Sequence, residues 1–204
     1  MLNDRSSILS LLATRRSGRP RDLVAPGPDA RQLEEILAIA MRSPDHGKLH
    51  PWRFVRIPPG RRADFAVLLD AAYRVDNPAP GRLELEANAR FAHQAPELIV
   101  ALSSPVKGHK IPVWEQLLSC GAACMNLLNA AHAMGFAGGW VTGWAAYSPT
   151  VLAAFGAPPE RIAGFIFLGT PGTELEERLR PERGEVVSEW APAPNASHGQ
   201  DVGE

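Results

Sequence analysis

Hydrophobic residues recur along the chain with two spacings, one typical of helices and one typical of strands. The clearest helical pattern starts at Asp29, a good N-cap, with Gln32 in the capping-box position and apolar residues at i, i+3, i+4 and i+7 from Leu33. The same reasoning predicts further helices at residues 6–13, 61–73, 82–93, 113–134 and 148–155, and strands at residues 52–57, 97–102, 138–142 and 162–168. With no internal repeat and no long linker, this order of elements predicts a single domain.

The segment from Val113 to Met134 consists almost entirely of Ala, Leu, Met, Cys and Asn, and Gly135 follows it as a stop signal. A helix that is apolar on most sides is predicted to be buried and central. It carries the only two cysteines, Cys120 and Cys124, which lie four residues apart on one helical face and exclude a disulfide framework. Because a chain of 204 residues would struggle to enclose this helix alongside its others, we predict a stable dimer.

Charges are unevenly distributed although the formal net charge is only −1. Residues 1–62 hold eleven arginines and one lysine against six acids, whereas residues 171–204 hold eight acids against three arginines. A small anionic ligand near the N-terminal third is therefore expected. Nucleic acid is disfavoured, because the basic residues are neither interleaved with aromatic residues nor placed along one long helix.

The charged and proline-punctuated end of the chain predicts a domain at residues 1–172 and a partly mobile C-terminal extension at residues 173–204. A wholly solvated tail has little use for Trp190, and the family resemblance described below implies that Val186, Val187 and Trp190 pack against a partner subunit while residues 191–204 are mobile. On composition alone, a fully disordered acidic tail is equally consistent. No apolar run is long enough to cross a bilayer and no export signal is visible, so no membrane association and a cytoplasmic location are expected.

The first candidate binding feature is Arg15-Arg16-Ser17 at the end of the first predicted helix. Guanidinium groups and a hydroxyl suit a phosphate, which accepts several charge-assisted hydrogen bonds at once. The alternative is a solvated helix end whose arginines complement the C-terminal dipole, and spacing alone favours this alternative.

The second feature is the loop from Arg42 to Trp52, which gathers Arg42, His46, Lys48 and His50 between a helix and a strand. It is placed either to bind an anionic aromatic ligand or to serve as a plain connection. Zinc is disfavoured, because the two histidines have no third ligand in the loop except Asp45.

The third feature is the glycine-rich stretch from Gly135 to Trp144. Its glycines would let a backbone approach a ring or a phosphate, but it matches neither a phosphate loop nor a dinucleotide fingerprint. A tight helix-to-strand turn is the simplest interpretation. Since no catalytic triad, metal-binding helix or Cys-x-x-Cys pair is present, chemistry by this chain would depend on a bound organic cofactor.

Taken in order, the segments Thr14–Ser17, Ala40–Phe54, Gly135–Gly143 and Phe167–Pro171 resemble the nitroreductase family, and more narrowly its small NAD(P)H nitroreductases. The resemblance covers residues 6–171 and includes Trp114-Glu115-Gln116. It implies an α+β nitroreductase-like fold with a central mixed sheet flanked by helices, an obligate homodimer, and FMN bound non-covalently at the dimer interface. The FMN contacts that it implies are Arg15, Arg16, Ser17, Arg42, His46, Trp140, Val141 and Thr142. The nicotinamide nucleotide is implied to contact Ala130, Ala131, His132, Ala133, Met134 and Gly135.

The implied activity is hydride transfer from NAD(P)H through flavin N5 to nitro compounds, quinones or similar small-molecule acceptors, with no catalytic side chain of the protein itself. The sequence departs from the family at Val141, where relatives usually carry a basic residue. This departure leaves two alternatives open: a flavin-binding sensor or carrier with little turnover, and a structural dimer whose basic third serves another anion.

Overall fold

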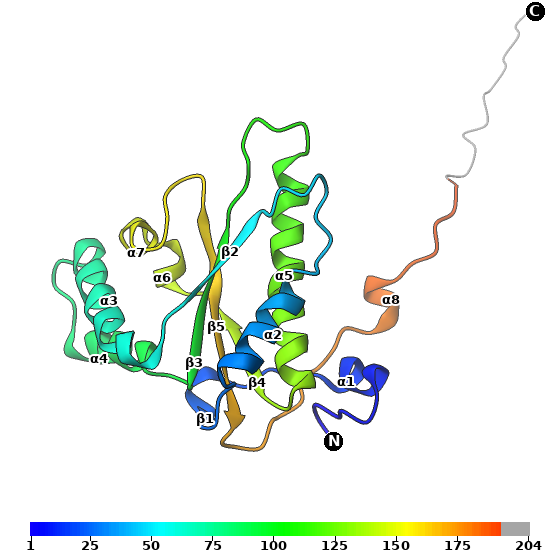
Figure 1. Cartoon of the computed structure of the whole chain (residues 1–204), viewed down its shortest axis with the longest axis horizontal. Helices are drawn as coiled ribbons and strands as arrows, with labels where there is room; N and C mark the ends of the chain where they lie inside the picture. The colour runs from blue at the N-terminus through cyan, green and yellow to red at the C-terminus, as the bar shows by residue number, and fades with distance from the viewer. Residues whose placement is uncertain (193–204) are drawn as a thin grey trace, which may run out of the picture.

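The computed structural model describes residues 1–192, so most of the segment predicted to be mobile lies outside the described residues. Its sheet is built around β5 (Arg161–Pro171), the longest strand. On one side of β5 lie β3 (Glu97–Ser103) and then β2 (Trp52–Arg56), whereas β4 (Ala137–Val141) pairs with residues 165–169 and the two-residue β1 (Leu23–Val24) pairs with residues 170–171. Figure 1 shows these strands as one twisted layer in the middle of the molecule.

Every strand pair within the described residues is antiparallel, so the α+β class is confirmed but the expected mixed sheet is wrong there. The directions follow from the connections between strands. Two helices separate β2 from β3, and an even number of helical passes returns the chain for an antiparallel neighbour. The strands β3 and β4 run in the same direction after a single helical pass, but β5 lies between them.

Helices cover both faces of the sheet (Figure 1). One face is covered by α2 (Ala30–Ala40) and α5 (Val113–Ala133), and the other by α3 (Arg62–Asp76), α4 (Arg82–Ala92), α6 (Trp144–Tyr147) and α7 (Pro149–Ala153). The short helices α1 (Ile8–Thr14) and α8 (Arg183–Val186) lie beyond the C-terminal end of α5, and two 3₁₀ turns span Pro20–Asp22 and Pro59–Arg61. No helix in residues 1–192 is both long and apolar enough to span a membrane.

The strands alternate their side chains between two separate cores, as the period of two requires. In β5, Phe165 and Phe167 join the core beneath α3 and α4, whereas Ile166 and Leu168 join the core beneath α2 and α5. The helical predictions also hold locally. The capping box of α2 is present, since Gln32 N donates to Asp29 Oδ1 (2.8 Å) and Asp29 N donates to Gln32 Oε1 (3.0 Å).

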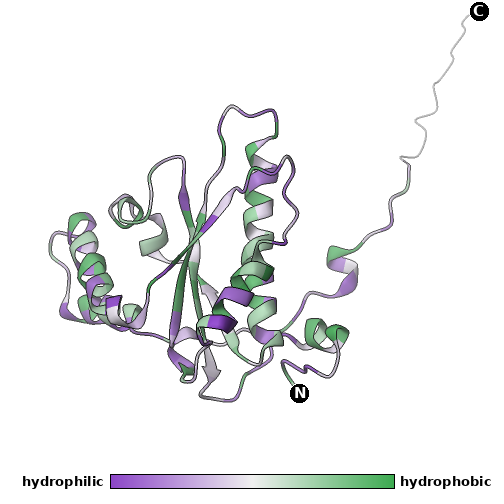
Figure 2. Ribbon diagram, in the orientation of Figure 1, coloured by the Kyte–Doolittle hydropathy of each residue, from purple (hydrophilic) through white to green (hydrophobic). Residues whose placement is uncertain are grey.

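The helix α5 starts and ends within one residue of its predicted bounds, and Figure 2 shows it as hydrophobic along most of its length. Cys120 and Cys124 are buried, free and directed toward the sheet, as predicted. The side of α5 away from the sheet is exposed in the single chain, however, with Trp114 67% and Leu118 54% exposed. A single chain therefore does not bury α5 on most sides in the way that the sequence predicts, and another surface would have to cover its outer face.

Candidate anion and cofactor site

The N-terminal basic segment is fixed by the end of α1 and by β4. Ser7 caps α1 by accepting a hydrogen bond from Ser10 N (3.0 Å), and the helix ends at Thr14 with Arg15 as its C-cap. The chain then runs extended along β4, where Gly18 N donates to Gly138 O (3.1 Å). Arg15, Arg16 and Ser17 are each partly buried in this segment, which is more enclosed than a solvated helix end.

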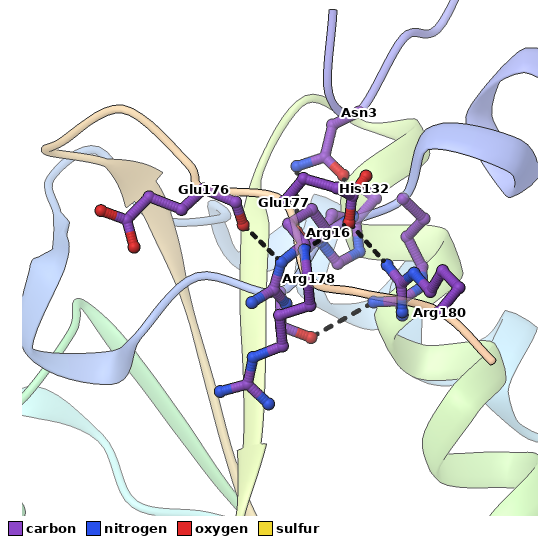
Figure 3. A network of polar contacts seen from close by, with 9 residues as sticks. Asn3, Arg16, His132, Glu176, Glu177, Arg178 and Arg180 are labelled. Atoms are coloured by element: carbon purple, nitrogen blue, oxygen red, sulfur yellow. Dashed lines mark hydrogen bonds and ion pairs between the residues drawn. The ribbon is translucent and has the colours of Figure 1, made fainter.

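The peptide of Arg16 is held from two sides (Figure 3). Asn3 accepts from Arg16 N through Oδ1 (2.7 Å) and donates to Arg16 O through Nδ2 (3.2 Å). On the other side, Nε2 of His132 lies 3.2 Å from the same carbonyl oxygen. The position of this basic segment is therefore set by residues far away in the sequence.

Positive charge accumulates around this peptide. Arg15 Nη1 donates to Ser17 Oγ (3.2 Å), Arg16 Nε donates to the carbonyl of Glu176 (2.7 Å), and Figure 3 places Arg178 and Arg180 beside Arg16. Neither Arg15 nor Arg16 forms an ion pair within residues 1–192. Partial burial, followed by the charges of Arg180 and Arg16, lowers the pKa of Arg15. A bound anion would relieve this repulsion.

Beside this cluster, β4 presents the residues predicted to contact a flavin ring. Trp140 is 38% exposed, and its Nε1 donates to Ala163 O (3.0 Å). Val141 and Thr142 line an open pocket of about 370 Å³ together with Arg19, Pro20, Arg21, Phe91 and Gln94. Arg19 and Arg21 are each paired with a carboxylate, Arg19 with Glu176 (3.2 Å) and Arg21 with Asp22 (3.8 Å).

The glycines of the third segment serve two purposes. A Cβ on Gly138 would lie 2.6 Å from Leu128 Cδ2, and one on Gly139 would lie 2.7 Å from Gly18 O. These two glycines therefore allow close packing within the chain, not approach of a ligand. Gly143, with φ of +108° and open space around its Cβ position, follows the predicted ring contacts and leaves the backbone accessible there.

The predicted second loop lies apart from the basic cluster. Asp45 organises the loop by accepting from Leu49 N (3.0 Å) and His50 N (2.9 Å), and His46 Nδ1 lies 2.7 Å from Glu115 Oε2 at the start of α5. Glu115 and His132 are separated along α5 by about 25 Å at the rise per residue of a helix. A single chain therefore does not bring His46 and the Arg15 cluster together.

Burial corrects the predicted nucleotide segment. Ala130, Ala131 and His132 are 4%, 0% and 0% exposed, so their side chains are not available for direct contact with a nicotinamide nucleotide. Ala133, the last residue of α5, and Gly135 are exposed, and Met134 is partly buried. The buried side of the helix therefore ends before these residues. Within residues 1–192, no group of three His, Cys, Asp or Glu side chains is arranged to hold a metal.

Several site residues were missed from the sequence. Asn3 gives no local signal, because its partner is thirteen positions away. Arg178 and Arg180 belong to the C-terminal extension, which is acidic overall. A charge count over the whole extension hid these two arginines, and only their spacing within it could have revealed them. Arg19 and Arg21 follow Arg15-Arg16-Ser17 directly in the sequence, and this proximity is the signal that could have assigned them to the site.

The fold and the site define an α+β domain with a basic corner next to a glycine-led strand. The nitroreductase family model matches residues 12–170, and the chain belongs to the nitroreductase family, a family of oxidoreductases. It is 40% identical over 173 residues to a Haemophilus influenzae protein named "Putative NAD(P)H nitroreductase", covering 83% of this chain and 91% of that protein.

Two solved structures show the same fold. The nitroreductase-like family protein from Bacillus cereus matches with a TM-score of 0.76 at 19% identity, covering 92% of this chain and 97% of that one. The nitroreductase with bound FMN from Bacteroides fragilis matches with a TM-score of 0.67 at 21% identity, covering 90% of this chain and all of that one (100%). The resemblance drawn from the sequence motifs is confirmed at the level of family and fold.

Proposed function

We propose that this chain is an FMN-dependent oxidoreductase that uses NAD(P)H to reduce nitro compounds, quinones or similar small acceptors. The observation that carries the proposal is the pair Arg15 and Arg16, neither of which has a carboxylate partner within residues 1–192. The same segment continues into Arg19 and Arg21, which line the Val141 pocket. The names of its relatives agree, since one is named for NAD(P)H and another holds FMN.

The residues present fit FMN. A phosphate monoester needs several donors and positive charge, which Arg15, Arg16 and Ser17 supply. A flat ring needs an accessible surface with an apolar side and polar edge contacts, which Val141, Thr142 and the accessible backbone at Gly143 supply. Arg19 and Arg21 add two guanidinium groups to the same pocket, partly neutralised by Glu176 and Asp22, and they would favour negative charge near the ring.

When bound, the flavin supplies the hydride chemistry that no side chain of this protein can perform. The protein's own part is to bind and orient. Arg15, Arg16 and Ser17 would hold the phosphate, the edge of β4 would support the ring, and the guanidinium groups of Arg19 and Arg21 would stabilise negative charge near it. For NAD(P)H, we propose contacts at the exposed residues Ala133 and Gly135 and at Arg5, whose guanidinium lies beside Gly135. We also propose a cytoplasmic location, where this co-substrate is available.

We propose a homodimer as the functional form. Trp114 and Leu118 expose large apolar side chains on the outer face of α5, and Ile8 and Leu9 do so on α1 with 79% exposure each. Such a surface is typical of an interface. A second chain would also bring Arg42 and His46 to the flavin from across the interface, which explains why one chain alone separates them from Arg15.

A yellow protein as purified would agree with bound flavin, and an anaerobic titration with NADH or NADPH tests turnover. We expect the flavin absorbance to bleach on addition of the nicotinamide and to return when a nitro compound or a quinone is added. A coloured protein that does not bleach would instead favour a flavin-binding sensor or carrier. This is the alternative that the absence of a basic residue at position 141 leaves open. A colourless protein that does not bind added FMN would refute both.

A further inference from the structure

His132 occupies an unusual position for an uncharged histidine. It is 0% exposed, its Nδ1 lies 2.6 Å from Leu128 O, and its Nε2 lies 3.2 Å from Arg16 O. Both ring nitrogens thus face carbonyl oxygens, which only accept hydrogen bonds. A neutral imidazole carries one N–H, so either tautomer leaves a lone pair directed at a carbonyl, and only the imidazolium donates to both.

The surroundings act against the imidazolium while no anion is bound. Burial, the largest influence, lowers the pKa of His132; the carbonyl of Leu128 raises it, and the guanidinium of Arg15 lowers it further. The basic segment contributes Arg15 and Arg16. The C-terminal segment adds Arg178 and Arg180 beside Arg16, together with Glu177, which pairs with Arg180 (3.1 Å) and offsets part of this charge. The N-terminal segment contributes the uncharged Asn3 and, against Gly135, Arg5. Residues 116–134 of α5 contain no other charged side chain.

We propose that His132 is a positioning residue, which holds the Arg15-Arg16-Ser17 segment through the Arg16 carbonyl and takes up one proton from solvent when a phosphate monoester binds there. The proposal rests on the proposed function in that the phosphate is taken to be that of FMN. A phosphate dianion beside Arg15 and Arg16 compensates the charges that oppose protonation. The imidazolium can then donate to both carbonyls and fix the peptide that carries the phosphate ligands.

Reciprocal linkage gives the proposal a measurable form. If binding raises the protonation of His132, protonation must strengthen binding by the same factor. The dissociation constant for FMN should therefore rise by up to about tenfold per pH unit, between the pH at which free His132 titrates and the pH at which bound His132 titrates.

The test is calorimetric titration of the apoprotein with FMN at one pH in buffers of different ionisation enthalpy, because the buffer dependence of the heat counts the protons taken up. Measurements at pH 7.5 and above avoid the titration of the FMN phosphate itself, whose second pKa is about 6. We expect proton uptake in the wild type, its loss in His132→Gln, and its retention in His93→Gln. His93 is a matched control, since its Nδ1 also lies close to the carbonyl four residues back (2.9 Å, Ala89 O), but the residue is exposed at the end of α4, on the face of the sheet opposite to α5.

A second measurement, by NMR, uses only the wild-type protein and therefore does not require that any variant folds. The ring ¹⁵N shifts of His132 in the wild type should move from neutral to imidazolium values when FMN is added, and the same titration is repeated with inorganic phosphate. Binding of FMN without proton uptake by His132 would overturn the inference and leave the proposed function intact. Protonation of His132 by inorganic phosphate in a protein that does not bind FMN would support the inference and refute the function, and no response to either ligand would refute both.

Discussion

Removing the Arg15 side chain separates the ligand-binding role of the basic cluster from a structural role. Within residues 1–192, the Arg15 side chain bonds only to Ser17 Oγ, and it lies close to the like charges of Arg180 and Arg16. In the apoprotein, Arg15→Ala therefore removes repulsion as well as a weak contact, and the free energy of unfolding should change by less than about 1 kcal/mol. The role of Arg15 in binding FMN should have a larger effect.

A charge-assisted hydrogen bond to phosphate contributes about 1.5–3 kcal/mol, so Arg15→Ala should weaken FMN binding by about 10- to 150-fold. The assay is fluorescence titration of the apoprotein with FMN, together with chemical denaturation of the same apoprotein. Arg31→Ala is the control, because Arg31 is exposed and pairs only with Glu35 on the surface of α2 (3.6 Å). An unchanged dissociation constant, or a loss of apoprotein stability as large as the loss of affinity, would show that Arg15 serves the end of α1 and not a phosphate.

Three further predictions concern stability and assembly. Arg53 and Ser104 donate to Glu160 and hold its pKa at about 2, below the ordinary 4.5, so this carboxylate stabilises the fold above pH 4.5 and loses that effect as the pH falls toward 2. Because Arg53 is 46% exposed, Glu160→Gln should cost only about 1–2 kcal/mol at pH 7 and almost nothing near pH 2, as measured by denaturant titration; an equal cost at both would contradict the ion pair. Leu118→Glu should give a monomer by sedimentation equilibrium at low micromolar concentration, while Val67→Glu, at a more exposed site on α3 (69% against 54%), should not. A monomeric wild type with FMN bound would refute the dimer. Truncation after Gly172 removes the bond from Arg16 to Glu176 and the segment with Val186, Val187 and Trp190, so we expect lower dimer stability or altered acceptor kinetics; unchanged melting and turnover would favour a disordered tail.

The C-terminal segment shows why assembly is the least certain part of a sequence-based prediction. Val186, Val187 and Trp190 are 66%, 52% and 88% exposed in the single chain, so the prediction that they pack on a partner subunit stays a prediction. The same holds for the division at residue 172. The hydrogen bond from Arg16 to Glu176 O and the ion pair of Arg19 with Glu176 nevertheless tie this segment to the basic cluster, which composition alone assigned to the other end of the chain.

Local sequence determined the helices, the strands and the motifs of this protein. The capping box at Asp29, the apolar run of α5 and the i, i+4 placement of Cys120 and Cys124 depend on residues within one or two helical turns of each other. Interactions over so short a range are the same in most tertiary contexts. The sequence also pointed to the family through motifs whose order and spacing could be read directly.

Only the tertiary structure decided which of these pieces meet. The antiparallel direction of every described strand pair depends on the path of the connecting helices, and the burial of His132 depends on a contact with Arg16, 116 positions away. The same packing removed Ala130–His132 from the predicted nucleotide contacts and placed Arg19 and Arg21 beside Val141. Contacts of this range follow from the closing of the whole chain around its cores, which spacing along the sequence does not record.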